Sequence, residues 1–211
     1  LPSVYQSMLS ADLKASPSLK MVIVAGEACE QSLVEDHQAH ATWSQSKLIN
    51  EYGPTEACVW STYFDCTNAQ GNIVPIGVAA PHSAVYVLDD ALQLCPLGVS
   101  GELYIGGEAL ARGYINAEAL TKTKFIPSPF DDSSRLYKTG DLVRCLPDKE
   151  GLPGNLEFLG RQDHQLKIRG FRIELGEIET VIAKHQNVAE AVVLAKHMGT
   201  TENSKQLVAY V

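Results

Sequence analysis

The sequence predicts a mixed fold that begins as α/β, continues as β and ends as α+β. Near the start, two short apolar runs flank a polar stretch with helical spacing. The centre holds strand-like runs between glycine, proline and aspartate residues, and the end alternates strand, helix and strand. We therefore expect three parts, at residues 1–65, 66–162 and 163–211.

The first part should hold two parallel strands joined by a helix. Its expected elements are a helix at 2–13, a strand at 20–25, a helix at 30–41 and a strand at 47–50. No hairpin signal separates the two strands, so a parallel α/β unit is indicated. Ligands of such units gather at the carboxyl ends of the strands, where Gly26 and Asn50 lie.

The second part reads as mostly β, in the form of a small distorted barrel or a sandwich. Strand-like runs occur at residues 84–88, 102–105 and 156–159, and turns are expected at Asp89-Asp90 and at 151–155.

The third part reads as the start of a small α+β domain. Two strands joined by a glycine-containing turn are expected within 166–173, and further strands at 189–194 and 206–211. Between them, a helix should carry Leu175, Ile178, Val181 and Ile182 on one face.

Composition excludes several classes of function. With 17 Lys and Arg against 25 Asp and Glu, the net charge is -8, and no basic stripe suits a nucleic acid. The five cysteines form no CxxC pair, which favours a reducing cytoplasm over a disulfide framework or a zinc site. No apolar run approaches the length of a membrane span, and no signal peptide is evident. Both ends read as cut from a longer protein.

Three stretches carry candidate chemistry. NEYGPTE, at residues 50–56, offers an aromatic face for a flat heterocycle, an amide for its edge, and a hydroxyl and a carboxylate for phosphate and Mg²⁺. Its alternative reading is a Gly-Pro turn that starts a helix. YKTGD, at 137–141, presents Asp141 after a tight turn, as for a ribose diol. Residues 160–179 contain four basic residues close together: Arg161, Lys167, Arg169 and Arg172. The alternative interpretation of this cluster is a basic hairpin exposed to solvent.

Together with GELYIGGEALARGY at residues 101–114, these stretches closely resemble, in order, the adenylation domains of nonribosomal peptide synthetases. The resemblance covers nearly the whole chain. It implies that residues 1–65 are the C-terminal part of an α/β subdomain, 66–162 a β subdomain, and 163–211 the beginning of a mobile C-terminal domain. It also implies an ATP-dependent, AMP-forming ligase that makes an aminoacyl-AMP and passes the acyl group to a phosphopantetheine carrier thiol.

The resemblance assigns roles to individual residues. Tyr52 would stack on adenine, Asn50 would meet its amino edge, and Gly26, Glu27 and Ala28 would form the opposite wall. Asp141 would bind the ribose hydroxyls, with Arg161, Lys167 and Phe158 nearby, although relatives often have Tyr in place of Phe158. Thr55 would contact phosphate and Glu56 would hold Mg²⁺, so that Thr55, Glu56 and Lys167 form the expected catalytic set.

Further roles concern the substrate and the carrier. Ile23, Ala25, Glu51, Val59 and Trp60 fall on positions that line the amino-acid pocket, and Glu51 favours a polar or cationic substrate side chain. Asp163 matches the hinge, and Gly170 would line the path of the pantetheine arm. A peptidyl carrier domain and a condensation domain are the implied protein partners.

The resemblance also implies groups that this chain lacks. The phosphate loop and the amino-binding aspartate should precede Leu1, and a catalytic lysine should follow Val211, so the 211-residue chain is expected to be inactive alone. Two alternatives stay open: an acyl-CoA or aryl acid ligase of the same superfamily, and an AMP-binding module without turnover. His37 and His40 are interpreted as a solvated helix face rather than a metal site.

Overall fold

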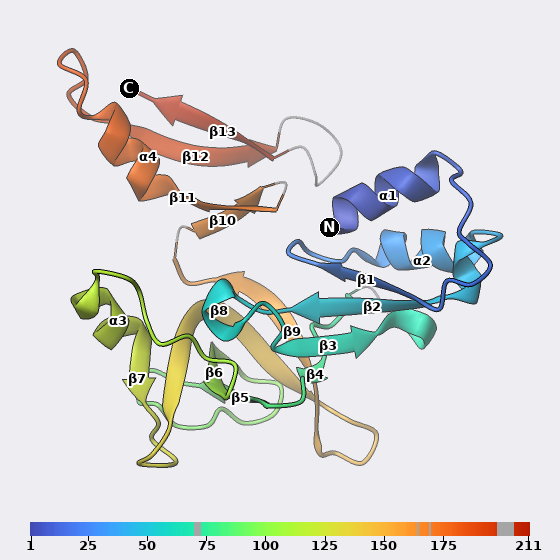
Figure 1. Ribbon diagram of the computed structural model, residues 1–211. Helices are drawn as coiled ribbons and strands as arrows, with labels where there is room; N and C mark the ends of the chain where they lie inside the picture. The colour runs from blue at the N-terminus through green and yellow to red at the C-terminus, as the bar shows by residue number, and fades with distance from the viewer. Residues whose placement is uncertain (70–72, 164, 169, 198–204) are drawn as a thin grey trace.

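The computed structural model describes residues 1–69, 73–163, 165–168, 170–197 and 205–211. Figure 1 shows two sheets beside one another, with the C-terminal helix and hairpins lying apart from them near the first helix. Two of the predicted positions fall partly or wholly outside the description: Arg169, and the side chain of Lys167.

The first part of the chain builds a four-stranded sheet, called sheet A, in the order β1-β2-β3-β4. Its strands are β1 (Met21–Ala25), β2 (Lys47–Tyr52), β3 (Thr62–Asp65) and β4 (Val78–Ala79). The helices are α1 (Pro2–Ser10) and α2 (Gln31–Ala39), with short 3₁₀ turns η1 (Trp43–Gln45), η2 (Thr55–Ala57) and η3 (Cys66–Asn68). β1 and β2 are parallel, as predicted, and the other pairs are antiparallel.

Alternation along β1 and β2 explains how sheet A is covered. Val24 and Leu48 point toward α1 and α2 and join a buried core with Tyr5 and Leu33. His37 belongs to this core too, so the prediction of a solvated histidine was wrong. Its Nε2 donates to the carbonyl of Ser46 at 3.0 Å, and its Nδ1 accepts from the Tyr5 hydroxyl at 2.6 Å. Burial lowers the pKa of His37, so the ring is neutral and fully bonded.

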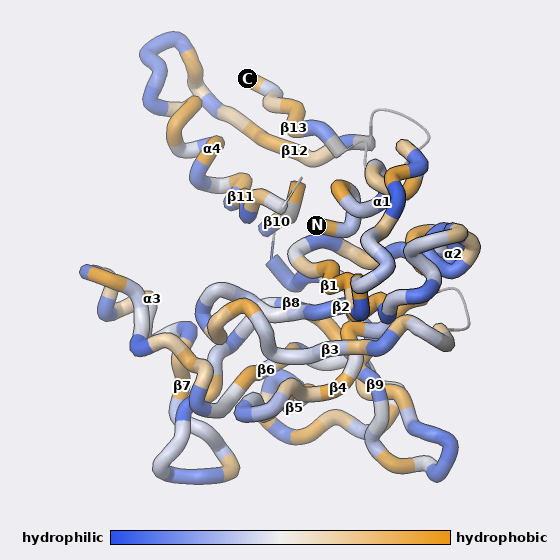
Figure 2. Tube along the Cα trace, turned by 45° about the vertical axis from the view of Figure 1, so that its right-hand side comes forward, coloured by the Kyte–Doolittle hydropathy of each residue, from blue (hydrophilic) through white to orange (hydrophobic). Residues whose placement is uncertain are grey.

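The middle of the chain forms a curled antiparallel sheet, called sheet B, in the order β5-β6-β8-β7 with β9 also on β8. Its elements are β5 (Ser83–Leu88), β6 (Ser100–Gly107), α3 (Glu118–Lys124), β7 (Phe125–Pro127), β8 (Arg135–Pro147) and β9 (Pro153–Arg161). The turn expected at 151–155 lies a few residues earlier: the Asp148 amide donates to the Leu152 carbonyl at 2.8 Å, and β9 already begins at Pro153. Figure 2 shows this turn as a hydrophilic loop.

The two sheets share a second core. Ala57 and Ile76 from the sheet A side pack with Leu103, Val143 and Leu156 of sheet B. The Leu156 amide donates to the carbonyl of Gly77 at 2.7 Å, and this bridge connects β9 to the segment that immediately precedes β4. Sheets A and B are therefore one packed body, while the expected boundaries at 65 and 162 stay predictions.

The last part holds two hairpins and a helix. These are β10 (Gln165–Ile168) with β11 (Phe171–Glu174), α4 (Leu175–Ile182), and β12 (Val192–His197) with β13 (Lys205–Tyr210). Leu175 is buried on α4, as expected, whereas Val181 is 60% exposed. No helix among the described residues is long and apolar enough to cross a membrane.

Candidate functional site

The carboxyl ends of β1 and β2 lie side by side, because the two strands are parallel and Ala25 is in register with Glu51. Asn50 is buried, and its Nδ2 donates to the carbonyl of Pro75 at 2.9 Å. That bond fixes the amide orientation and leaves Oδ1 as the end that can accept a hydrogen bond from a ligand. Beyond β1, the loop of Gly26, Glu27 and Ala28 meets the first helix, where a Glu27 oxygen accepts the Ser3 amide at 3.0 Å.

Tyr52 and Arg161, two predicted residues that lie far apart in the sequence, both contact Asp141. Tyr52, at the end of β2, donates its hydroxyl to one Asp141 oxygen, and Arg161, on β9, donates to the other. Asp141 and Arg161 also face each other in the β8–β9 ladder. Arg161 adds a bond to the Thr139 carbonyl at 3.0 Å. We call Asp141, Tyr52 and Arg161 the Asp141 corner.

The Asp141 corner is buried and electrostatically paired. Asp141 is 5% exposed. Burial and the neighbouring Asp141 carboxylate raise the pKa of Tyr52, which stays a neutral donor. Burial would lower the pKa of Arg161, but its bonds to Asp163 and the charge of Asp141 raise it above its usual value. The guanidinium is therefore a permanent cation at this position.

Asp163, the predicted hinge, is held by the same arginine. Arg161 donates from Nε and Nη2 to the two Asp163 oxygens, each at 2.7 Å. Burial alone would raise the pKa of Asp163, but this paired arginine holds it below its usual range. Gly140 lies beneath the pair with a φ of +78°, and a Cβ there would come within 2.9 Å of Arg161 and of Asp163. The prediction of a tight turn before Asp141 was wrong, because Gly140 lies inside β8 at a shift in the β6–β8 register, and it is this irregular strand backbone that requires glycine.

The aromatic wall of the site is formed by Tyr52 and Phe158. Their ring centroids are 6.4 Å apart and the planes are tilted by 41°. Phe158 is 38% exposed. Phe158 has no hydroxyl, so ring packing is the contact that it offers at this position.

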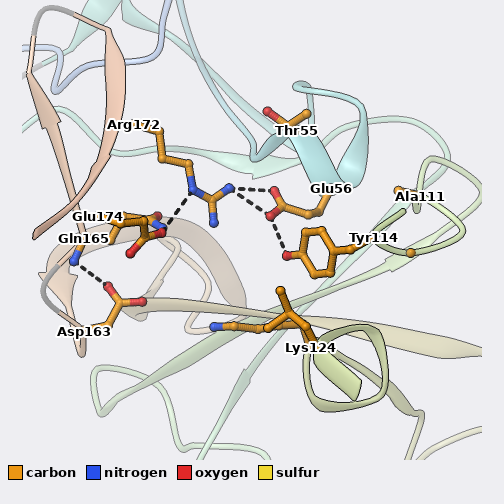
Figure 3. A pocket seen from close by; sticks show the side chains of 11 residues that line it. Thr55, Glu56, Ala111, Tyr114, Lys124, Asp163, Gln165, Arg172 and Glu174 are labelled. Carbon is orange, nitrogen blue, oxygen red and sulfur yellow. Dashed lines mark hydrogen bonds and ion pairs between the residues drawn. The ribbon is translucent and has the colours of Figure 1, made fainter. Parts of the chain in front are cut away.

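A second buried carboxylate, Glu56 in η2, has partners of the same kind. The Tyr114 hydroxyl donates to its Oε1 at 2.6 Å, and Arg172 Nη1 lies 2.9 Å from both oxygens (Figure 3). Burial alone would raise the pKa of Glu56, but the bonds from Tyr114 and Arg172 hold it below its usual value. We call Glu56, Tyr114 and Arg172 the Glu56 corner.

A cavity of about 710 Å³ opens beside the Glu56 corner, between η2, α3 and the β10–β11 hairpin. Thr55 lines it, with Lys124, Asp163, Gln165 and Glu174 around the rim (Figure 3). Thr55, the predicted phosphate contact, thus lines a cavity that the buried Glu56 carboxylate also lines. Gly170 lies outside this lining, in a left-handed conformation against Leu1.

Three of the expected substrate-pocket residues lie on the face of sheet A that does not pack against α1 and α2. Ile23, Ala25 and Glu51 share that face, since alternate residues of a strand point the same way. Glu51 is half-buried, and burial raises its pKa. Tyr63, opposite Glu51 on β3, contacts Trp60 at a ring-centroid distance of 6.3 Å.

Val59 has an unusual backbone in the loop that follows Glu56. Its φ is +72°, and the Trp60 amide donates to the Cys58 carbonyl at 2.9 Å, closing a γ-turn around it. A left-handed β-branched residue is strained. The side chain of Val59 is 58% exposed, and that of Trp60 is 43% exposed, on the open side of the loop.

Sequence reasoning missed three residues of these sites. Tyr114 lies in a quoted motif but received no role, Arg172 was counted only as part of a basic hairpin, and Tyr63 was not considered. Each becomes visible only through a contact with a residue distant in the sequence: Tyr114 and Arg172 with Glu56, and Tyr63 across the β2–β3 ladder.

Comparison with known proteins identifies the family of the chain. The sequence profile of the family described as AMP-binding enzyme matches residues 1–115. A linear gramicidin synthase of Brevibacillus parabrevis is 49% identical over 209 residues, which is 99% of this chain and 4% of that protein. Tyrocidine synthase 3 of the same organism is 46% identical over 198 residues, which is 92% of this chain and 3% of that protein. The chain therefore spans a small fraction of the curated relatives it matches.

Two solved structures show the same fold. The structure of PA1221, described as an NRPS protein containing adenylation and PCP domains, has a TM-score of 0.82 and 27% identity over 99% of this chain and 41% of that one. The Vibrio cholerae adenylation domain AlmE, solved in complex with glycyl-adenosine-5'-phosphate, has a TM-score of 0.82 and 30% identity over 100% of this chain and 40% of that one.

Proposed function

Because the chain belongs to the AMP-binding enzyme family, we propose that it is the part of a nonribosomal peptide synthetase adenylation domain that binds the nucleoside and closes over it. The reaction would join an amino acid and ATP into aminoacyl-AMP and pyrophosphate, then pass the acyl group to a carrier thiol. The observation that carries the proposal is the Asp141 corner, where motifs from β2, β8 and β9 converge on one buried carboxylate.

The nucleoside would lie across this corner. Asn50 Oδ1 can accept from an adenine amino group, because Nδ2 is held by the Pro75 carbonyl. The adenine ring would lie along Tyr52, with the loop of Gly26, Glu27 and Ala28 as the other wall. Asp141 would accept the two ribose hydroxyls, and the bond from Arg161 would orient that carboxylate. Phe158 and Lys167 would flank the ribose.

The phosphates would extend toward Thr55 and Glu56. One carboxylate is enough protein ligation for Mg²⁺, which usually keeps several waters and binds substrate phosphates. The carboxylate of Glu56 is therefore a suitable type of ligand for Mg²⁺. In the described structure, its two oxygens accept hydrogen bonds from Arg172 and Tyr114. Bound Mg²⁺ would neutralise phosphate charge; Thr55 would orient the phosphate and Lys167 would contribute cationic charge.

The amino-acid side chain would lie over the open face of sheet A, among Ile23, Ala25, Glu51, Val59 and Trp60. Glu51 is the one carboxylate of that set, and its half-burial costs free energy unless a donor pairs with it. We therefore propose a substrate with a cationic or hydrogen-bonding side chain. Tyr63, which faces Glu51 across the ladder, would join this pocket.

The transfer step needs a partner. A peptidyl carrier domain bearing phosphopantetheine would approach past Gly170, with Asp163 as the pivot of the small C-terminal part, and a condensation domain would act next. All five cysteines are free thiols, which fits the cytoplasm as the proposed compartment.

The proposal is tested by amino-acid-dependent exchange of pyrophosphate into ATP, measured on the full-length protein across the common amino acids. Asp141→Ala should lower exchange at least about 100-fold, because the ribose loses its acceptor. Asp132→Ala, an exposed aspartate in the β7–β8 loop, is the matched control and should leave exchange unchanged. Equal exchange in both variants would overturn the assignment of Asp141.

Two further outcomes identify the alternatives. Exchange that depends on a fatty or aryl acid rather than an amino acid would favour an acyl or aryl acid ligase. AMP binding by a folded full-length protein that shows no exchange with any acid would favour a module without turnover. The isolated 211-residue chain should show no exchange, because no Gly-x-x-x-x-Gly-Lys-Ser/Thr phosphate loop occurs in it.

A further inference from the structure

Asp141 lies at an irregular place in sheet B. Leu103 of β6 stands alone opposite residues 139–141 of β8, because the register of the β6–β8 ladder shifts there. We call residues 139–141 the β8 bulge. A bulge interrupts the ladder hydrogen bonds and turns side chains in directions that a regular strand does not give them. The direction of the Asp141 carboxylate therefore depends on what holds the β8 bulge in place.

Two side chains hold the β8 bulge against β6. The Thr139 hydroxyl donates to the Leu103 carbonyl at 2.7 Å and accepts the Asp141 amide at 2.9 Å. The amide of Gly140, which lies between them, donates to Glu102 Oε1 at 2.8 Å. Side chains thus accept two backbone amides that a regular ladder would pair with carbonyls of the neighbouring strand.

Glu102 is suited to hold the Gly140 amide firmly. Its side chain is 6% exposed, and its second oxygen, Oε2, accepts the Tyr104 hydroxyl at 3.2 Å and lies 3.4 Å from Lys138 Nζ. Neighbours on both β6 and β8 therefore fix the carboxylate. A hydrogen bond to a carboxylate is stronger than one to a neutral carbonyl. Gly140 is buried, so its amide loses free energy of bonding if Glu102 is removed and nothing replaces it.

The contact reaches Asp141 through the backbone alone. Gly140 precedes Asp141 directly, and the bonds of these two amides fix the backbone on both sides of the left-handed Gly140. On the opposite side, Tyr52 and Arg161 bind the two carboxylate oxygens of Asp141. The described partners of Glu102 are different residues from those that we propose for the nucleoside.

We propose that Glu102 is a positioning residue for the ribose: by accepting the Gly140 amide, it sets the shape of the β8 bulge and so directs the Asp141 carboxylate toward the ribose hydroxyls. Glu102 acts through Asp141 and does not touch the nucleotide. The inference rests on the proposed function, in which Asp141 accepts the ribose hydroxyls. It predicts a selective defect, because a protein without this acceptor keeps its adenine contacts and loses the benefit of the hydroxyls.

The test compares AMP with 2′,3′-dideoxy-AMP, which lacks both ribose hydroxyls, by equilibrium binding to the full-length protein. The wild type should bind AMP at least about 10-fold more tightly, because hydrogen bonds to a carboxylate are lost with the hydroxyls. Glu102→Met removes the acceptor and fills similar space, so it should weaken AMP by about 10-fold and change dideoxy-AMP by less than about 2-fold. Equal weakening of both nucleotides, or of neither, would overturn the proposal.

The conservative variant separates the hydrogen bond from the charge. Glu102→Gln keeps a side-chain oxygen for the Gly140 amide and should therefore retain most of the preference for AMP. A loss of preference as large as that of Glu102→Met would contradict the role of this hydrogen bond.

The matched control is Glu157→Met. Glu157 is a buried glutamate of the same sheet, with its side chain 4% exposed, and it accepts from Arg144 Nε at 2.6 Å. It faces Arg144 across the β8–β9 ladder, outside the β8 bulge. This variant should keep the wild-type preference for AMP. An equal loss of preference in Glu157→Met and Glu102→Met would show a general effect of a damaged sheet and would overturn the specific role of Glu102.

Two further measurements cover the remaining outcomes. If Glu102→Met does not fold, Glu102→Asp replaces it, because it withdraws the carboxylate from Gly140 by one methylene; a wild-type preference for AMP in Glu102→Asp would overturn the proposal. A wild type that binds both nucleotides equally would refute the proposed ribose contact of Asp141. Hydrogen exchange then tests Glu102 by itself: the β8 bulge should exchange faster in the Glu102 variant than in Glu157→Met, and equal exchange would overturn its positioning role.

Discussion

The Asp141 corner and the Glu56 corner are built from the same three kinds of group. Each holds a buried carboxylate, a tyrosine hydroxyl and an arginine: Asp141 with Tyr52 and Arg161, and Glu56 with Tyr114 and Arg172. Each arginine has a pKa raised above its usual value, although burial opposes this, because of the carboxylates beside it.

The two corners differ in what holds the arginine. Arg161 faces Asp141 across the β8–β9 ladder, so backbone hydrogen bonds position it whatever the ligand state. Arg172 is on a hairpin that pairs only with itself among the described strands, and its contact with Glu56 is a side-chain contact. The same three groups are thus held by a strand ladder in one place and by a separable side-chain contact in the other.

The largest expected effect tests the permanence of the Asp141 corner. Arg161→Met should lower the free energy of unfolding by about 3–5 kcal/mol, because it leaves a buried carboxylate without its cation. Arg161 is 18% exposed, so solvent compensates little. Chemical denaturation checks this, with Arg135→Met, an arginine bonded only to backbone carbonyls in the described structure, as the control. A loss of less than about 1 kcal/mol would contradict the prediction, because it would mean that the Arg161–Asp141 pair contributes no more than an exposed ion pair.

A backbone change probes the same corner with a smaller effect. Gly140→Ala should cost about 1–2 kcal/mol from the left-handed backbone alone. The added Cβ would also push on Arg161 Nη2 and Asp163, each 2.9 Å away. We expect weaker AMP binding by calorimetry together with the lower stability. Gly151→Ala has a φ of +79° and nothing within 4 Å of its added Cβ, so it controls for backbone strain and should leave AMP binding unchanged.

Removing the separable contact should have a smaller and local effect. Arg172→Met should cost about 1 kcal/mol, since Glu56 loses its cation but keeps the Tyr114 hydroxyl. Arg172 is partly exposed, so solvent lowers the cost of losing this pair. Hydrogen exchange should speed up in β10 and β11 while β8 and β9 stay protected. Faster exchange across sheet B would mean that the Glu56 corner is as integral to the body as the Asp141 corner.

The smallest effect is a pH dependence of the Glu56 corner. Its carboxyl has a folded-state pKa below the ordinary 4.5, so the contact stabilises the protein above that pH and the stabilisation is lost as the pH falls below it. Melting temperatures between pH 3 and 7 check it. Glu56→Gln should flatten the dependence relative to wild type, and an identical pH profile would contradict the pairing.

Much of the local structure followed from the sequence. The spacing of apolar residues predicted the parallel β1–β2 pair, and glycine and aspartate punctuation predicted β5, β6 and β9 of sheet B but not β7 or β8. These signals are local, because periodicity and turn residues act within a few positions. The turn expected at 151–155 lies at 148–152, because the sequence does not fix which of several neighbouring residues begins the strand. Val181 is exposed although it was expected on the buried face of its helix, because hydrophobic residues also occur on exposed surfaces.

The motifs by themselves predicted the family, which the AMP-binding family match confirms, and from it Asn50, Tyr52 and Asp141 are the residues that we propose for the nucleoside. Only the tertiary structure decided the partners of the buried groups. His37 became a core residue because Tyr5 and Ser46 satisfy both ring nitrogens, and Glu56 received Arg172 from 116 residues away. A buried polar group must be paired, but sequence spacing does not tell which distant residue the folded chain will bring to it.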